Sequence, residues 1–159
     1  MVWTYGRDGQ YFSYFYDGLD RLTWVATPGA QADVTFGYDL LGRQLWSQTS
    51  GTGGFSLQYA YDALSRPQWE LGPLGFVSWS WDAASRNTRI TWPDGFYAAY
   101  DYDLTGAMTA VREDGATSGN GVLATYGYDP LGRRISAVRG NGVATAYGWD
   151  GRAGWSAWR

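Results

Sequence analysis

The chain of 159 residues contains no cysteine, no histidine and no lysine. Without cysteine, neither disulfides nor thiolate metal sites can hold the protein together. The absence of histidine removes the most frequent general base and metal ligand, and the absence of lysine excludes a Ser-x-x-Lys pair. We therefore expect no catalytic residues, no cofactor and no metal site, and we expect that the protein is not an enzyme.

Strong charge and long apolar runs are also missing. The formal net charge is −3 and no stretch is strongly basic, so the clustered basic face that nucleic acid binding requires is absent. No apolar run approaches the roughly 20 residues of a membrane span. The first residues lack the charged and apolar regions of a signal peptide. We expect neither nucleic acid as a partner nor a membrane span.

Aromatic residues and glycine are abundant instead. Phe, Trp and Tyr make up 18% of the chain, with ten Trp and thirteen Tyr, and there are 23 Gly. Disordered chains are poor in aromatic residues, so we expect an ordered protein. Aromatic residues combined with many glycines favour strands joined by tight turns, and nowhere does a helical spacing of apolar residues persist.

A repeat runs along the whole chain. An aromatic residue followed by Asp recurs every 20 to 26 residues. The seven pairs are Tyr16-Asp17, Tyr38-Asp39, Tyr61-Asp62, Trp81-Asp82, Tyr102-Asp103, Tyr128-Asp129 and Trp149-Asp150. We call these seven Asp residues the motif aspartates. The pattern predicts one array of repeats over residues 1–159, anchored at the motif aspartates and without a separate catalytic or toxin domain.

Two further positions complete the motif. Four residues after Asp stands an Arg in five copies, with Ala107 and Gly154 as exceptions: Arg21, Arg43, Arg66, Arg86 and Arg133. The residue before that position is small in every copy except Asp20: Gly42, Ser65, Ser85, Gly106, Gly132 and Ala153. Asp can bond its own backbone two residues on, and Gly accepts a positive φ, so Asp-x-x-Gly-Arg predicts a tight turn.

The segments before each motif aspartate alternate strictly. The residues one and three positions before Asp are aromatic in all seven copies, and the intervening residues are mostly small or polar, with Phe15 as an outlier. A period of two places these aromatic side chains on one face of a strand. Short runs after each turn predict the partner strands: Leu22-Thr23-Trp24-Val25, Gln44-Leu45-Trp46-Ser47 and Arg134-Ile135-Ser136-Ala137-Val138.

The remaining connections are also turns. Pro93-Asp94-Gly95 and Asn141-Gly142 between alternating runs are strong hairpin signals. Residues 114–121 form the longest link and explain the 26-residue interval as an insertion. Trp24, Trp46 and Trp69 all stand seven residues after their Asp, so we expect them to stack in register across neighbouring units and to form a possible stacking surface for sugars. Ordinary cross-strand packing is the simpler alternative.

The motif resembles that of the YD-repeat or RHS family. Tyr38-Asp39-Leu40-Leu41-Gly42-Arg43 and Tyr128-Asp129-Pro130-Leu131-Gly132-Arg133 are full matches, and the resemblance covers residues 5–159. It implies a strip of β-hairpins like those of bacterial toxin shells and of teneurins, and a secreted or cell-surface location. The family's self-cleaving region carries paired Asp-Pro-x-Gly motifs, whereas this sequence has one, so autoproteolysis is not carried over.

The expected fold is therefore all-β, a strip of antiparallel hairpins coiled or stacked as a solenoid. A single-layer sheet cannot bury an aromatic face alone, because domains are built of packed layers. We expect the face to be covered by the strip itself, by further repeats of a longer chain, or by copies of the chain. The leading functional hypothesis is a structural scaffold that self-associates through open strand edges into a fibre. The alternatives are a fragment of a toxin's encapsulating shell and a carbohydrate- or cell-surface-binding module, with glycans as partners.

The charged residues are expected to have structural roles. An Asp and an Arg four residues apart are expected to stabilise a turn, with the Arg pairing the Asp or stacking on a neighbouring ring. A calcium site or a glycosidase pair among the acidic residues is set aside, because no calcium-loop pattern occurs. These acidic residues are Asp94, Asp101, Asp103, Glu113 and Asp114.

Overall fold

The computed structural model describes residues 2–5, 9, 11–29, 32–51, 53–149 and 155–157. The chain forms two compact units, unit 1 (Met1–Ser78) and unit 2 (Trp79–Arg159). The prediction that residues 1–159 form one array stays a prediction. The seventh motif aspartate, Asp150, lies outside the described residues.

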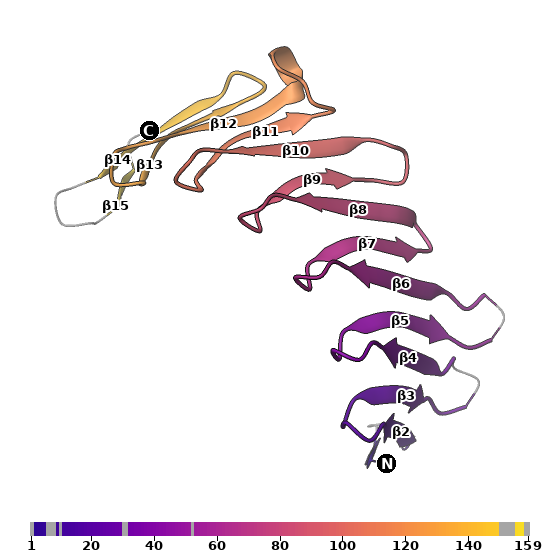
Figure 1. Ribbon diagram of the computed structural model, residues 1–159. Coiled ribbons are helices and arrows are strands. Elements are labelled where there is room, and N and C mark those ends of the chain that lie inside the picture. The colour runs from indigo at the N-terminus through magenta and orange to yellow at the C-terminus, as the bar shows by residue number, and fades with distance from the viewer. Residues whose placement is uncertain are drawn as a thin grey trace. The chain divides into compact units, whose positions relative to one another are not determined.

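Antiparallel strands account for nearly all regular structure, as predicted, and Figure 1 shows them as successive hairpins. The order of the strands in the sheet is their order in the chain. Unit 1 holds β1 (Val2–Tyr5), β2 (Tyr11–Tyr16), β3 (Leu22–Ala26), β4 (Val34–Tyr38), β5 (Gln44–Thr49), β6 (Ser56–Tyr61) and β7 (Pro67–Gly72). The next strand, β8 (Gly75–Trp81), spans the boundary between the units.

Unit 2 continues the same pattern. Its strands are β9 (Asn87–Thr91), β10 (Tyr97–Tyr102), β11 (Met108–Glu113), β12 (Val122–Tyr128), β13 (Arg134–Arg139), β14 (Ala144–Trp149) and β15 (Trp155–Ala157). The expected insertion at residues 114–121 contains a single turn of 3₁₀ helix, η1 (Gly119–Gly121). In the part of the chain that the structure describes, no helix is long and apolar enough to cross a membrane.

The six motif turns that the structure describes have the same backbone geometry. At Asp39 the amide N–H donates to the carbonyl of Arg43 at 2.9 Å, and the N–H of Gly42 donates to the carbonyl of Asp39 at 3.1 Å. Gly42 has a φ of 82°. This is a type I turn followed by a left-handed residue that forms a bulge, which explains the preference for Gly at this position. Asp20 takes the same conformation at a φ of 57°, which Asp tolerates better than most residues.

The strand register separates two faces of the sheet. Tyr38 and Phe36 lie on one face with the other residues one and three positions before a motif aspartate, and we call it the tyrosine face. Trp46 lies directly opposite Gly37 on β4 and opposite Gln58 on β6, so it projects from the other face, which we call the tryptophan face. The predicted alternation is therefore present. The outlier Phe15 lies on the tryptophan face, opposite Trp24.

Neither unit contains a conventional core. Among the described residues, only Ala98, Ala110 and Ser47 are buried. Within the described residues the strip itself does not bury its aromatic face, and cover by further repeats of a longer chain or by copies of the chain stays a prediction. The physical reason is that consecutive hairpins extend one sheet edge to edge and add no second layer.

Candidate functional site

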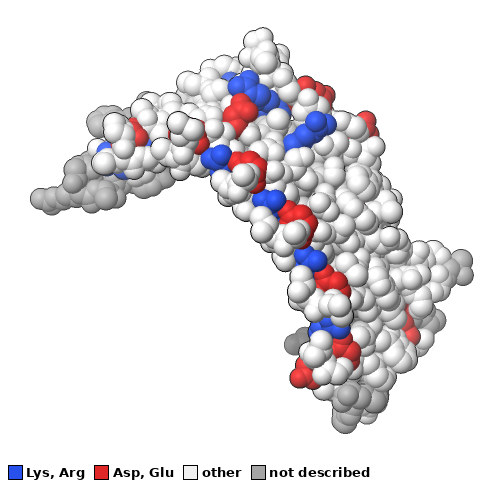
Figure 2. Space-filling model, in the orientation of Figure 1, with Lys and Arg blue, Asp and Glu red and all other residues white. Residues whose placement is uncertain are grey.

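The motif aspartate is saturated by its own turn. One carboxylate oxygen of Asp39 accepts the N–H groups of Leu41 and Arg43, both at 2.9 Å, and the other accepts Nε of Arg43 at 2.6 Å. The turn thus fixes both the backbone and the guanidinium. The same three bonds occur at Asp17, Asp62, Asp82 and Asp129. Figure 2 shows the resulting acidic and basic residues side by side.

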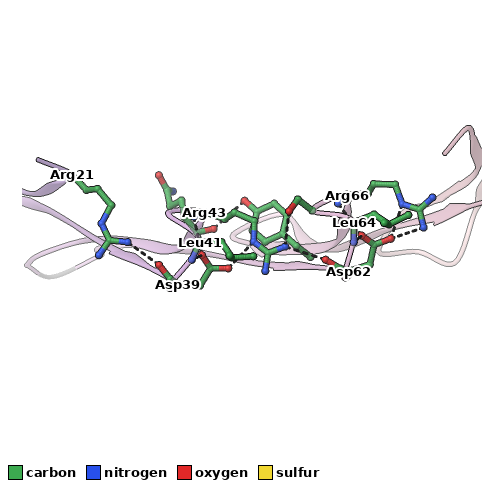
Figure 3. A network of polar contacts seen from close by, with 10 residues as sticks. Arg21, Asp39, Leu41, Arg43, Asp62, Leu64 and Arg66 are labelled. Atoms are coloured by element: carbon green, nitrogen blue, oxygen red, sulfur yellow. Dashed lines mark hydrogen bonds and ion pairs between the residues drawn. The ribbon is translucent and has the colours of Figure 1, made fainter. Parts of the chain in front are cut away.

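The motif arginine also reaches the next repeat (Figure 3). Nη1 of Arg43 donates to the backbone carbonyl of Asp62 at 3.0 Å, and its guanidinium lies 4.9 Å from the ring centroid of Tyr61. Arg21 does the same toward Asp39, at 2.8 Å. In unit 2, Arg86 reaches the carbonyl of Asp103 at 3.0 Å. One planar side chain therefore joins two successive turns, which Lys, as a point charge, could not do equally well.

In five repeats the aromatic residue before the motif aspartate reaches back in the opposite direction. The hydroxyl of Tyr61 donates to the carbonyl of Gln44, at the start of the preceding repeat's second strand, at 3.0 Å. Equivalent bonds join other repeats: Tyr38 to Leu22, Tyr102 to Asn87, Tyr128 to Met108, and Nε1 of Trp149 to Arg134. The forward arginine and the backward tyrosine form what we call the inter-repeat staple.

Charge and hydrogen bonds at the turn shift the acidity of the motif aspartates. At Asp17, the hydrogen bond from the backbone N–H of Arg21 is the main cause that holds the pKa below the ordinary value of 3.8. At Asp39, burial alone would raise the pKa, but the backbone N–H and guanidinium of Arg43 outweigh it, so the pKa is again lowered. The pKa is also lowered at the other described motif aspartates, Asp62, Asp82, Asp103 and Asp129.

One repeat lacks the arginine and shows what replaces it. Ala107 stands where the other repeats have Arg, and Asp103 instead accepts the hydroxyl of Thr105 at 2.6 Å. That bond is the main cause of its lowered pKa. The backward bond from Tyr128 to Met108 persists at 2.8 Å. This junction therefore keeps half of the staple.

The tryptophan face of unit 1 carries rings, but they do not stack on each other. The ring of Trp24 lies 4.3 Å from that of Phe15 at an interplanar angle of 14°, and the ring of Trp69 lies 5.7 Å from that of Phe76. The described residues show no ring contact among Trp24, Trp46 and Trp69. Neighbouring repeats are two strands apart, about 9.6 Å, which exceeds stacking distance. The expected mutual stacking of these three rings is therefore wrong.

Trp46 has a particular resting place. A Cβ added to Gly37 would lie 2.0 Å from Nε1 of Trp46, so the indole occupies the space above the Gly37 backbone. The ring lies across the neighbouring strand β4 and remains 39% exposed. Sequence reasoning missed Gly37 and Phe15 as ring partners. The signal was present, because in five of the repeats the residue two before Asp faces the residue seven after it.

Three of the other acidic residues make structural bonds. Asp101 pairs with Arg112, and one carboxylate oxygen of Asp114 accepts the N–H of Tyr97 at 2.9 Å. Asp94 accepts the N–H of Phe96 within its own turn. No group of three or more potential metal-ligating side chains gathers among the residues that the structure describes.

Comparison with known proteins relates the fold to toxin complexes. No protein-family model matches the sequence, and no curated protein matches it. The chain is similar to a chain in the structure of a Photorhabdus luminescens Tc holotoxin pore, with a TM-score of 0.70, 18% identity, and coverage of 95% of this chain and 9% of that chain. A chain in the crystal structure of TcdB2-TccC3 matches with a TM-score of 0.66 at 19% identity, over 91% of this chain and 9% of that one. The chain thus shares its fold with about a tenth of much longer polypeptides.

Proposed function

We propose that this chain is a wall segment, a structural strip of β-hairpins that forms part of the encapsulating shell of a longer RHS-type polypeptide. In this role the chain supplies sheet surface and performs no chemistry. The family resemblance extends the proposal to a secreted or cell-surface location. The inter-repeat staple suits such a role, because it fixes each hairpin to the next without a core.

The observation that carries the proposal is the missing core. Among the described residues, Ala98 and Ala110 are the only buried hydrophobic side chains, although 18% of the sequence is aromatic. Each large aromatic side chain can bury about 150–250 Å². A sheet with this much uncovered apolar surface is stabilised by material outside it, which a longer polypeptide supplies.

A row of leucines along the motif turns supports the same proposal. Leu19, Leu41 and Leu64 each stand two residues after a motif aspartate and are 70%, 72% and 65% exposed. Contiguous exposed apolar side chains mark contact surfaces. The backbone N–H group of each leucine donates a hydrogen bond to the motif aspartate of its turn, so each leucine is held at the same place at the ends of the strands.

The natural product of the gene tests the proposal. Antibodies raised against the 159-residue chain would be used to isolate every polypeptide that carries its peptides from the source cells, followed by intact-mass measurement and negative-stain microscopy. We expect a polypeptide several times heavier than 17.6 kDa, in hollow particles. A free 17.6 kDa species as the main product would contradict the wall proposal.

A second candidate is self-association into a fibre. Within the described residues, β1 and β15 each pair with a neighbour on one side only, and open edges are templates for pairing. Sedimentation velocity over a hundredfold dilution tests this. Self-association predicts large assemblies. The substitution Thr4→Lys on the edge strand β1 should dissociate them, whereas Ser80→Lys on the interior strand β8 should leave them intact. Monomers at every concentration would remove this candidate and leave the wall proposal standing.

A further inference from the structure

Asparagine is scarce in this chain, and two of its three copies precede glycine. These are Asn120-Gly121 and Asn141-Gly142, whereas Asn87 precedes Thr88. The backbone nitrogen that follows an asparagine can attack the side-chain carbonyl carbon, Cγ, and a side chain on that following residue obstructs the attack. Glycine has no Cβ and lets the two atoms approach. The two Asn-Gly pairs are therefore the asparagines of this chain that are most open to this reaction.

Asn141 stands at the exposed tip of the hairpin between β13 and β14. Its Oδ1 accepts the N–H of Val143 at 3.1 Å, which draws electrons from Cγ and makes that carbon a better electrophile. A Cβ added to Gly142 would meet no atom within 4 Å, so the space beside the attacking nitrogen is open. One contact opposes the reaction, because the N–H of Gly142 donates to the carbonyl of Arg139 at 2.8 Å. This bond has to open first, and exposed turns open at low cost.

The second Asn-Gly pair lies beside the first. Asn120 belongs to η1, in the insertion between β11 and β12, and is exposed. A Cβ added to Gly140 would lie 2.9 Å from the backbone carbonyl oxygen of Asn120, and the N–H of Gly140 donates to the carbonyl of Leu123 at 3.0 Å. Both asparagines line one open groove of about 520 Å³, together with three neighbours: Leu123, Arg139 and Gly140.

The lining of this groove holds one charged residue, Arg139. Its side chain is exposed and forms no ion pair or hydrogen bond within the described residues, whereas Arg133, just before the same strand, pairs with Asp129 at 2.7 Å. A positive charge close by stabilises the negative charge that develops during the attack. It also offers a partner to a carboxylate formed at either asparagine. The groove therefore favours both the reaction and its product.

Asn87 has the opposite environment in the same unit. It lies in β9, which has a hydrogen-bonded strand on each side. Its Oδ1 is buried and accepts no hydrogen bond from the residues that the structure describes, so nothing polarises Cγ. The next residue, Thr88, places a branched Cβ beside the nitrogen that would attack. Asn87 is therefore an internal control.

We propose that Asn141 and Asn120 are sites of spontaneous deamidation that turn this groove from basic to acidic. At Asn141, the backbone nitrogen of Gly142 loses its proton to solvent and bonds to Cγ, while the bond from Cγ to Nδ2 breaks and ammonia leaves. Water then opens the cyclic imide at either carbonyl and leaves aspartate or isoaspartate. The net reaction consumes one water and releases one ammonia, so it needs no oxidant or reductant.

The reaction at both sites changes the charge of the groove. One guanidinium gives +1 before the reaction, and one guanidinium with two new carboxylates gives −1 after it. The proposal is independent of the wall proposal, because it concerns the chemistry of two turns in whichever polypeptide contains them. Unchanged asparagines would leave the wall intact, and a free 17.6 kDa natural product would leave the deamidation sites intact.

The test incubates the full 159-residue chain at pH 7 and pH 9 in water enriched in ¹⁸O. Digestion with pepsin at low pH, where the backbone nitrogen keeps its proton, is followed by tandem mass spectrometry of the peptides that contain each asparagine. We expect the Asn141 and Asn120 peptides to gain three daltons, because oxygen from the solvent replaces the lost nitrogen. The gain should be faster at pH 9 and should yield both aspartate and isoaspartate, and the Asn87 peptide should stay unchanged.

Matched variants identify the contribution of each residue. Asn141→Gln should abolish the mass gain at position 141, since the longer side chain cyclises far more slowly, and Asn120 should react as before. Arg139→Gln should slow both sites severalfold, and the fold should persist because this side chain is exposed and unpaired among the described residues. The double variant Asn120→Asp, Asn141→Asp should elute with the aged chain on anion exchange.

Three results would overturn the proposal. The first is no mass gain at either Asn-Gly pair in the folded chain under conditions in which the urea-unfolded chain gains mass at both. The second is an equal gain at Asn87, which would show that the surroundings of Asn141 and Asn120 do not matter. The third is an unchanged rate at both sites in Arg139→Gln, which would remove the groove from the account.

Discussion

The two units of the chain use the same hairpin but differ at one repeated position. Seven residues after the motif aspartate, unit 1 has Trp24, Trp46 and Trp69. The described repeats of unit 2 have other residues there: Arg89, Ala110 and Ser136. Arg89 lies over the ring of Tyr97 at 3.5 Å, and Ala110 is buried. The tryptophan face of unit 1 is thus aromatic and uncharged at this position, and that of unit 2 is small or charged.

The two units share the contacts that hold the sheet together and differ in the side chains on one of its faces. The motif turn and the backward hydrogen bond to the preceding repeat occur in both units, at Tyr38 as at Tyr128. The residue seven positions after the aspartate differs between the repeats, but the strand register stays the same. Its cross-strand partner, two positions before the aspartate, differs with it: Gly37 lies opposite Trp46, and Asp101 lies opposite Ala110. The staple is therefore the conserved mechanical element within this chain, and the tryptophan face is its variable surface.

Acid is expected to have the largest effect, because it acts on both units together. The pKa of each described motif aspartate lies below the ordinary value of 3.8, so the unfolded chain takes up protons first as the pH falls. Stability should be fully present above about pH 5 and should decline as the pH drops through 3.8 toward the folded-state pKa values. Urea midpoints from pH 7 to pH 2, with carboxyl NMR titration, measure this. A midpoint that rises on acidification would contradict the staple.

Glycines at equivalent positions should respond differently in the two units. A Cβ on Gly37 would lie 2.0 Å from the Trp46 indole, and a Cβ on Gly127 would lie 2.4 Å from Oγ of Ser136, a small group that can rotate away. We expect Gly37→Ala to cost about 2 kcal/mol through overpacking, with a red shift of tryptophan emission as the indole is displaced. Gly127→Ala should cost about 0.5 kcal/mol or less. Equal losses in urea unfolding would show that Trp46 does not rest on Gly37.

Removing a single oxygen atom, the hydroxyl of Tyr61, removes one backward hydrogen bond. The hydroxyl of Tyr61 donates to Gln44, whereas Tyr100, on the same face in unit 2, has no hydroxyl bond among the described residues. Tyr61→Phe should lower the free energy of unfolding by about 1 kcal/mol, and Tyr100→Phe should have little effect. Chemical denaturation of both variants measures these changes. A larger loss of unfolding free energy for Tyr100→Phe than for Tyr61→Phe would be inconsistent with the staple.

Much of the fold follows from the sequence because the repeat fixes it. Alternation predicted the strand faces, and Asp-x-x-Gly-Arg predicted turns whose fourth residue has positive φ, as at Gly42. The Asp–Arg pair within one turn is local, so spacing alone suggested it. The contact of Arg43 with Asp62 is not local, because it depends on which strand edges meet after pairing.

The tryptophan face was harder to predict. Equal spacing of Trp24, Trp46 and Trp69 suggested mutual stacking, but two strands separate successive repeats, and each ring therefore packs on its own hairpin. The absence of a second layer packed on the sheet could not be predicted either, because the sequence pattern shows which side chains share a face but not what packs against that face. The aromatic content indicated a need for cover without showing its source.

Ala107→Arg tests most directly the claim that the staple, rather than a core, holds the repeats together. The new guanidinium would meet the carboxylate of Asp103 and the ring of Tyr128, as Arg86 meets Asp82 and Tyr102. We predict a gain over the original chain in urea unfolding at pH 7, of which the cation–π contact contributes about 0.5–1 kcal/mol, and the gain should vanish below pH 3. No gain over Ala107→Gln, in a variant that folds, would contradict the account.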